Sequence, residues 1–356
     1  MNDNQILILS NIPRVPTSIT SILKAVSEKY DIPLSTLKLN AKILKDLNLI
    51  TYGSAKRFRG AELTGLGRVI LSLVSEDDLS VLGNLVSTQS GPQNMGVVIT
   101  KIRKNILRMI GEAGSGHLGG SFSAVEVLAV LYFLRMRHDP KNPGWEGRDH
   151  FILSKGHAAP ALYAILAEAG YFPMSELSKL RESNSILQGH PHNKTPGIDA
   201  VSGSLGQGLS VANGMAMAAK MDGTDSRIYV LLGDGELDEG QVWEAAMTAA
   251  HYGLDNIVAI VDRNWFQLSG RTEDIKALEP LAEKWRAFGW NVLDIDGNDP
   301  EQILSALEES DLRKGMPTVI IARTTKGKGV SFMEGNRFSY RPPNEKELKQ
   351  ALERLN

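Results

Sequence analysis

Two oxygen-bearing side chains, Asp234 and Asn264, each follow a short apolar run, and together they could hold a small cation. Asp234 lies in the tripeptide Gly233-Asp234-Gly235, where glycine allows the backbone to approach a ligand closely. Carboxylate and amide oxygens suit Mg²⁺, and Ca²⁺ and Mn²⁺ share this preference. Because Mg²⁺ in proteins commonly bridges to phosphate groups, these residues point to a phosphate-bearing ligand. The tripeptide alone would fit a surface turn equally well.

The two apolar runs, Ile228 to Leu232 and Ile257 to Val261, predict buried parallel strands because they are rich in β-branched residues and do not alternate with polar ones. An amphipathic helical pattern separates them, which predicts a βαβ unit. A right-handed crossover brings the carboxyl ends of both strands to one edge of the sheet. We therefore expect Asp234 and Asn264 to lie close together, at the edge where ligands bind in such sheets.

Three histidines each follow a glycine in a predicted loop: His117, His157 and His190. His157 comes directly after a predicted strand, Phe151 to Ser154. Imidazole can donate a hydrogen bond to a phosphate or hydroxyl and can relay protons near neutral pH. Metal ligation is a weaker alternative, because no helical spacing joins the three residues. One such histidine would more often be structural, but three of them predict a shared cavity.

A glycine-rich segment, Gly203 to Gly208, leads into a predicted helix of small residues from Ser210 to Lys220. Glycines at a helix start allow close packing, and they can also place backbone donors and carbonyls against a planar heterocycle. Helices and apolar strands alternate from Val97 onward. This pattern predicts an α/β domain with a parallel sheet and helices on both faces.

The composition is that of a globular chain, with 42% apolar and 22% charged residues among 356. A net charge of −2 implies no overall attraction to nucleic acid or membrane. The absence of cysteine excludes disulfides, thiolate nucleophiles and cysteine-ligated zinc. We expect no membrane span and no signal peptide, and hence a cytoplasmic location.

The sequence predicts three parts. These are a small winged helix-turn-helix-like domain at residues 1–80, a linker at residues 81–95, and the α/β domain at residues 96–356. A first helix has one apolar face, and a second runs from Leu34 to Leu47 with lysines on its other side. Two short strands, Leu49 to Tyr52 and Ala61 to Thr64, flank a basic loop at 53–60. The apolar face of the first helix consists of Ile19, Ile22, Leu23, Val26 and Tyr30.

This module leaves two interpretations open. The lysine-bearing helix is placed like a DNA-recognition helix. However, residues 1–90 hold ten Lys and Arg against eight Asp and Glu, which is far from a strongly basic balance. Weak DNA contact and a role in protein interaction or dimerisation both remain compatible with the sequence.

Six segments of the α/β domain resemble the amino-terminal half of transketolases, in the same order. The resemblance covers residues 99–335 and separates the chain from deoxyxylulose-phosphate synthases, which lack two of the segments in this form. In this sequence the segments are G-S-G-H-L-G-G, S-K-G-H-A-A-P-A-L-Y, G-H-P, G-S-L-G-Q-G-L-S, L-L-G-D-G-E-L-D-E-G and T-K-G-K-G.

The resemblance implies thiamine diphosphate as cofactor, held through Mg²⁺ or a similar cation. Asp234, Asn264 and the backbone carbonyl of Phe266 would bind the metal. The cofactor itself would contact the glycine turn, one histidine and the backbone atoms of two further residues. The implied cofactor contacts are Gly233, Gly235 and His157 at the diphosphate, and Gly203 and Leu205 at the aminopyrimidine.

The resemblance also implies the reaction, in which a two-carbon ketol unit passes from a ketose phosphate to an aldose phosphate. His190 would bind the donor hydroxyl, and His117 would assist proton transfer at the acceptor. Glu239 would contact the partner's catalytic glutamate, although it could equally be a helix-start acid stabilised by the macrodipole. Transketolases usually carry another histidine after T-K-G-K-G, where this chain offers Ser339 or Tyr340.

A full transketolase continues with a pyrimidine-binding domain, whereas this sequence ends after a predicted helix from Asn344 to Leu355. We therefore expect one half of a split transketolase, active with a separate carboxyl-terminal subunit in an assembly of two copies of each chain. The alternative is a DNA-binding regulator that uses the α/β domain as a ligand sensor.

Overall fold

The computed structural model describes residues 92–335 and 341–355 continuously, together with single residues and short segments between Ile8 and Leu63. The chain divides into two compact units, Met1–Gly96 and Val97–Asn356. Each unit is treated by itself below.

The first unit contains the predicted first helix as α2, Ile19–Tyr30, with Ile22, Leu23 and Val26 buried. Strand β1, Ile50–Thr51, pairs antiparallel with β2, Glu62–Leu63, inside the two strands predicted from the sequence. Helical residues of the second predicted helix contribute Leu37, Ala41 and Leu44 to the same small core. The basic loop at 53–60 lies outside the described residues. The winged-helix interpretation therefore stays a prediction.

The prediction of a linker at residues 81–95 is wrong at the carboxyl end of that range, because helix α6 spans Pro92–Ala113. Pro92 is the first residue of this helix. Proline suits that position, since its fixed φ matches the helix and its missing N–H would have no intrahelical partner there. Residues 81–91 of the predicted linker lie outside the described part of the chain.

The second unit is built on a parallel five-stranded sheet with the order β3-β4-β5-β9-β8. The predicted βαβ unit is confirmed, since β4 pairs in parallel with β5 from Ile228 opposite Ile257 to Gly233 opposite Asp262. Both strands are buried along their whole length, as unalternated apolar runs predict. The strands are β3 His150–Leu153, β4 Ile228–Gly233, β5 Ile257–Arg263, β8 Asn291–Asp296 and β9 Thr318–Arg323.

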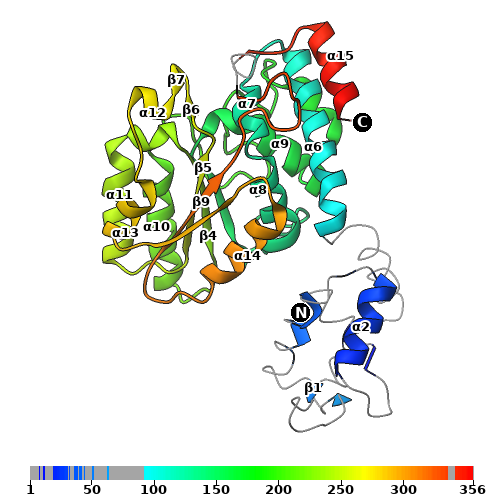
Figure 1. The fold of residues 1–356 in the computed structure, drawn as a ribbon, viewed down its shortest axis with the longest axis vertical. Helices are drawn as coiled ribbons and strands as arrows, with labels where there is room; N and C mark the ends of the chain where they lie inside the picture. Colours follow the sequence, from blue (N-terminus) through cyan, green and yellow to red (C-terminus); the bar gives the residue numbers. More distant parts are fainter. Residues whose placement is uncertain are drawn as a thin grey trace. The chain divides into compact units, whose positions relative to one another are not determined.

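Helices cover both faces of this sheet, as Figure 1 shows. One side carries α10, Gly208–Met221, α11, Gly240–His251, and α13, Leu281–Ala287. The other carries α8, Val125–Val130, and α14, Pro300–Ser310, which contact each other. The three-layer α/β fold predicted from the sequence is therefore confirmed.

Shorter elements connect the strands and helices of these layers. Helix α9 follows β3 through a 3₁₀ turn, and a two-stranded hairpin follows β5. Their bounds are α7 Leu118–Phe122, α9 Ala159–Ala169, α12 Thr272–Ile275, β6 Phe266–Gln267 and β7 Gly270–Arg271, with 3₁₀ turns at Gly156–Ala158, Met174–Lys179 and Gly235–Asp238.

The sequence was expected to contain no stretch long and apolar enough to cross a membrane. By length and composition alone, the segment Leu118–Arg135 is such a stretch. Its mean hydropathy is 1.4 over 18 residues, but 83% of it is buried inside the unit. It comprises α7, α8 and a π-helical turn at Leu131–Arg135. The apolar character of the segment is therefore that of a core helix, covered by protein on nearly all sides.

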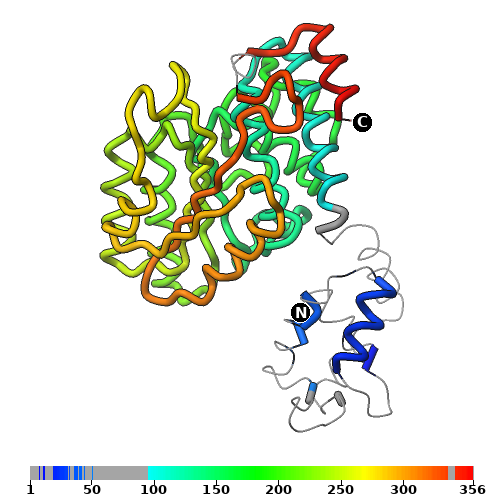
Figure 2. The backbone as a smooth tube through the Cα atoms, viewed as in Figure 1, coloured from blue at the N-terminus to red at the C-terminus, as the bar shows by residue number. Residues whose placement is uncertain are grey.

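The last described helix, α15 Glu345–Arg354, lies beside α6, as the tube in Figure 2 shows. A Cβ atom added at Gly111 of α6 would lie 2.8 Å from Leu348 Cδ2, so the two helices meet at a glycine. Asn344 begins α15 with a capping box, in which its side chain accepts from the Glu347 N–H at 2.9 Å.

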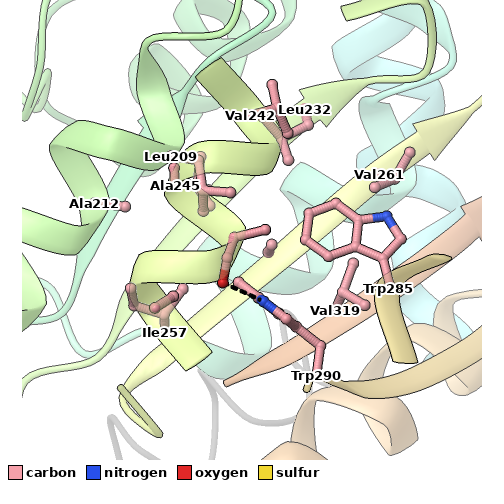
Figure 3. Packing of buried hydrophobic residues seen from close by; sticks show 14 of the residues in the cluster. Leu209, Ala212, Leu232, Val242, Ala245, Ile257, Val261, Trp285, Trp290 and Val319 are labelled. Carbon is pink, nitrogen blue, oxygen red and sulfur yellow. Dashed lines mark hydrogen bonds between the residues drawn. The ribbon is translucent and has the colours of Figure 1, made fainter. Parts of the chain in front are cut away.

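A large apolar cluster lies between the sheet and α10, α11 and α13 (Figure 3). Trp285 of α13 is fully buried, with its ring centroid 4.9 Å from that of Trp290. The indole N–H of Trp290 donates to the carbonyl of Ala246 in α11 at 2.9 Å. These two tryptophans fix α13 against the sheet.

We expect Trp285→Ala to lower the free energy of unfolding by about 3–5 kcal/mol, because it leaves a cavity that the close-packed surroundings cannot fill. Urea denaturation followed by far-ultraviolet circular dichroism measures the change. Met221→Ala, at a side chain that is 86% exposed, is the control and should shift stability by less than about 0.5 kcal/mol. Equal losses in the two variants would contradict this account of the core.

Candidate active site

A cavity of about 390 Å³ opens at the carboxyl edge of the sheet. Every residue predicted to form the site lines it, with the single exception of Glu239. The predicted residues brought together are His117, His157, His190, Gly203, Leu205, Gly233, Asp234, Gly235, Asn264 and Phe266. Residues from six separate segments of the sequence thus meet at one edge, as parallel strands and right-handed crossovers require.

Asp234 and Asn264 follow β4 and β5 and are both almost fully buried. Asp234 accepts hydrogen bonds from the N–H groups of Gly235 at 2.8 Å and Trp265 at 2.6 Å. The side-chain oxygen of Asn264 accepts from the Phe266 N–H at 3.1 Å. The turn that makes this possible places Trp265 at φ 71, a left-handed conformation that is uncommon outside glycine.

Burial raises the pKa of Asp234 to about 6, and the nearby charge of Asp262 acts in the same direction. The guanidinium of Arg263 partly offsets both, since it lies 3.3 Å from the Asp234 carboxylate. Arg263 is itself fully buried and stacks 3.8 Å from the centroid of the Trp265 ring. A carboxylate held in this environment would gain from an added cation.

Lys155, which lines the cavity, forms a buried ion pair with Asp262. The ammonium of Lys155 also donates to the carbonyl of Gly120 at 2.9 Å. Asp262 accepts further from Ser123 at 2.7 Å, and from the side chain of Thr324. Burial opposes ionisation, but the charge of Lys155 and these hydrogen bonds lower the pKa of Asp262. Asp262 is therefore a carboxylate that is paired and hydrogen-bonded inside the fold.

A second buried carboxylate, Glu236, joins three of the segments that line the cavity. It accepts from the N–H of Gly206 at 2.8 Å, from the N–H of Gly233 at 2.9 Å and from the Ser154 hydroxyl. Burial raises the pKa of Glu236 although these bonds counteract the shift. The glutamate thus fixes the distance between the S-K-G-H, G-S-L-G-Q-G and G-D-G segments.

The three predicted histidines lie around the cavity. The rings of His117 and His157 meet edge to face with centroids 5.5 Å apart. Burial, followed by the charge of Lys155, lowers the pKa of His157 to about 3. Burial also lowers the pKa of His117, with a further contribution from Arg181. Both imidazoles are therefore neutral at physiological pH.

Glycines at the cavity wall are needed for close approach. A Cβ atom at Gly235 would lie 2.6 Å from Gln267 Cβ, on the β6–β7 hairpin. A Cβ atom at Gly203 would lie 3.4 Å from His190 Cγ, so the His190 ring rests on this glycine. A larger residue at Gly235 would force Gln267 to shift, whereas a Cβ atom at Gly203 would meet the His190 ring at an ordinary contact distance.

The sequence analysis assigned no role to Lys155, Lys326 or Glu236, although all three lie in its motifs. Lys326 lines the cavity, and burial, followed by the charge of Lys155, lowers its pKa to about 8. Lys155, which is paired with Asp262, and Lys326 both line the cavity, and the charge of Lys326 suits an anionic ligand. The position of Lys155 at a strand's carboxyl end was the available signal. The burial of Glu236 had no signal in the sequence.

Glu239 is the predicted site residue that the structure places outside the cavity. It is exposed and is the N-cap of α11, with its backbone N–H bonded to the Glu236 carbonyl at 3.0 Å. A carboxylate at a helix start is favourable in its own right. Its contact with a partner chain stays a prediction.

No group of three or more His, Asp or Glu side chains suited to a metal occurs among the described residues. A cation at Asp234 would therefore combine one carboxylate with amide and carbonyl oxygens of Asn264 and Phe266, and would need oxygens from a bound ligand. Ser339 and Tyr340, considered as substitutes for a missing histidine, lie outside the described residues.

Comparisons with known proteins agree with this arrangement. Residues 96–355 match the family described as transketolase, thiamine diphosphate binding domain. A 6-deoxy-6-sulfo-D-fructose transketolase subunit from Clostridium sp. (strain MSTE9) is 52% identical over 240 residues, covering 67% of this chain and 87% of that subunit. An apulose-4-phosphate transketolase subunit from Phocaeicola vulgatus is 48% identical over 235 residues, covering 66% of this chain and 84% of that subunit.

Among solved structures, transketolase from Campylobacter jejuni is 35% identical with a TM-score of 0.70, covering 74% of this chain and 43% of that one. The chain thus spans most of the length of the two related subunits but less than half of this larger transketolase. The match covers the cavity and every element that builds it, and the chain belongs to the transketolase family, within its thiamine-diphosphate-binding domain.

Proposed function

We propose that this chain is the thiamine-diphosphate-binding subunit of a two-chain transketolase that transfers a two-carbon ketol unit from an anionic ketose to an aldose. The observation that carries the proposal is the single cavity in which three histidines, two lysines and the Gly-Asp-Gly turn converge. Support for two chains comes from the related subunits, whose lengths this chain nearly spans. Their named substrates, a sulfonated and a phosphorylated ketose, support an anionic sugar.

The residues present fit the cofactor. A diphosphate would find the ammonium groups of Lys155 and Lys326, the His157 ring and the amide of Gly235 on one side of the cavity. The Gly203 to Leu205 backbone on the other side would hold the aminopyrimidine. When bound, thiamine diphosphate supplies the carbon nucleophile and the electron sink of the reaction. The protein has to bind, orient and exchange protons with the sugar.

Proton exchange falls to the other two histidines in this proposal. His117 has a lowered pKa, so its ring is neutral and can accept as well as donate. His190 is exposed at the cavity edge, where a donor hydroxyl would arrive. In this proposal His157 binds the diphosphate, whereas the more exposed His190 binds the sugar. Cofactor binding and turnover therefore depend on different histidines.

A divalent cation, most simply Mg²⁺, with Ca²⁺ or Mn²⁺ as substitutes, would bridge Asp234 and the diphosphate. The buried carboxylate with its raised pKa supports this assignment, as does the oxygen-only ligand set. We further propose a cytoplasmic assembly of two copies of each subunit, since closed two-fold symmetry is the commonest arrangement. The intact cavity favours an enzyme over the ligand-sensing regulator, and the DNA contact of residues 1–80 has no support among the described residues.

The decisive experiment is a coupled transketolase assay on this chain and on its partner subunit, separately and mixed. We expect ketol transfer only from the mixture, because the site described here has no group that would activate the aminopyrimidine from its open side. Mass measurement of the mixture should give two copies of each chain. Full activity from this chain alone would contradict the two-subunit proposal, and no activity from the mixture with any ketose would contradict the function.

Asp234→Ala should abolish the Mg²⁺ dependence of thiamine diphosphate binding and weaken that binding at least tenfold, because the diphosphate loses its bridging cation. Calorimetric titration of the reconstituted enzyme with and without Mg²⁺ measures both effects. Asp238→Ala is the matched control, since Asp238 lies in the same 3₁₀ turn but outside this cavity. Equal cofactor affinity with and without Mg²⁺ in the unaltered protein would refute the metal assignment.

The lowered pKa of His157 predicts a pH-dependent stability. Between pH 6.5 and about 3 the unfolded chain binds a proton at this residue and the folded chain does not, so stability falls as the pH falls through this window. The contribution is about 1.4 kcal/mol per pH unit at most. Melting temperatures of the unaltered chain and His157→Gln should converge from pH 7 to pH 5. A constant difference would show that His157 is protonated in the fold.

A further inference from the structure

The loop that carries His190 depends on contacts with its surroundings for its shape. Residues 180–207 are all described and contain no helix or strand. Asp199 ties this loop to the start of β3, where it accepts from the Phe151 N–H at 2.8 Å. That anchor lies nine residues beyond His190, so a second contact has to set the position of the histidine itself.

Tyr163 of α9 provides that contact. Its side chain is fully buried, and its hydroxyl donates to the backbone carbonyls of Gln188 at 3.0 Å and His190 at 2.9 Å. The single hydroxyl hydrogen is shared between two acceptors that flank Gly189, which fixes the backbone on both sides of that glycine. Burial raises the pKa of Tyr163, so the hydroxyl keeps its proton throughout the working pH range.

The helix that carries Tyr163, α9, also begins just after His157, the histidine proposed to bind the cofactor. His157 lies in the 3₁₀ turn Gly156–Ala158, and α9 starts at the next residue. Tyr163 is six residues further along, in the second turn of the helix. Because α9 is buried from Ala159 to Ala167, it is a rigid connection between the two histidines. Movement of the His190 backbone away from the cavity would break both hydrogen bonds to the tyrosine.

We propose that Tyr163 is a positioning residue for turnover, which holds His190 at the distance from the cavity where it meets the donor hydroxyl. This inference rests on the proposed function, because the role of His190 does. Tyr163 itself lines no part of the cavity. Its effect passes through the backbone of residues 188–190.

The test is Tyr163→Phe in the reconstituted two-chain enzyme, which keeps the packing of the ring and removes only the hydroxyl. We expect kcat with the ketose donor to fall by about threefold to tenfold, the size of one lost hydrogen bond. The dissociation constant of thiamine diphosphate should change less than twofold, since His157 and the lysines are unaffected. Unchanged kcat, or an equal loss of cofactor affinity, would overturn the proposal.

Tyr229→Phe is the matched control, because this tyrosine of β4 is equally buried and its hydroxyl has no hydrogen-bond partner in the described structure. It should leave kcat and cofactor affinity unchanged. A drop in kcat equal to that of Tyr163→Phe would show a general effect of removing buried hydroxyls, and would refute the positioning role.

A double-mutant cycle separates positioning from general destabilisation. His190→Ala should lower kcat, and adding Tyr163→Phe to it should cost little more, because the residue being positioned is gone. Additive losses would overturn the proposal. If the unaltered enzyme transfers no ketol unit, the proposed function fails instead, and the two failures are thereby distinguished.

Discussion

The buried ion pair between Lys155 and Asp262 is the interaction on which the rest of the site depends. Removing two charges from water is costly, and the cost is recovered only when each charge is paired and its remaining hydrogen-bonding capacity is filled. Here the carboxylate also accepts from Ser123 and Thr324, and the ammonium donates to Gly120. These partners come from segments far apart in the sequence, so the pair holds the carboxyl edge of the sheet together.

This arrangement explains the kind of ligand that the cavity accepts. Asp262 is paired with Lys155 and Glu236 is satisfied by three donors, so the other charged side chains at the cavity are Asp234, which Arg263 partly offsets, on one side and Lys326 on the other. An anion that carries a divalent cation complements both sides at once. A diphosphate with its metal would have that charge pattern, and the cation would add to the partial compensation that Arg263 gives Asp234.

The errors of the sequence interpretation share a cause. Pro92 was placed in a linker although it begins α6, and a buried apolar segment as long as Leu118–Arg135 was not expected, because local signals do not show what packs around a segment. Glu239 lies outside the cavity as the exposed N-cap of α11, and its contact with a partner chain stays a prediction. Lys155 stood in a motif but received no role, since its partner Asp262 lies 107 residues away.

By itself the sequence determined the parallel α/β fold and ten of the eleven predicted cavity residues, because buried strands have a recognisable composition and their carboxyl ends must share an edge. Only the tertiary structure decided which charged side chains at the site are paired with each other. Burial is a property of the packed whole, and it sets the lowered pKa of His157 and the raised pKa of Asp234. The same holds for Tyr163, whose hydroxyl meets the His190 loop only because α9 and that loop fold against each other.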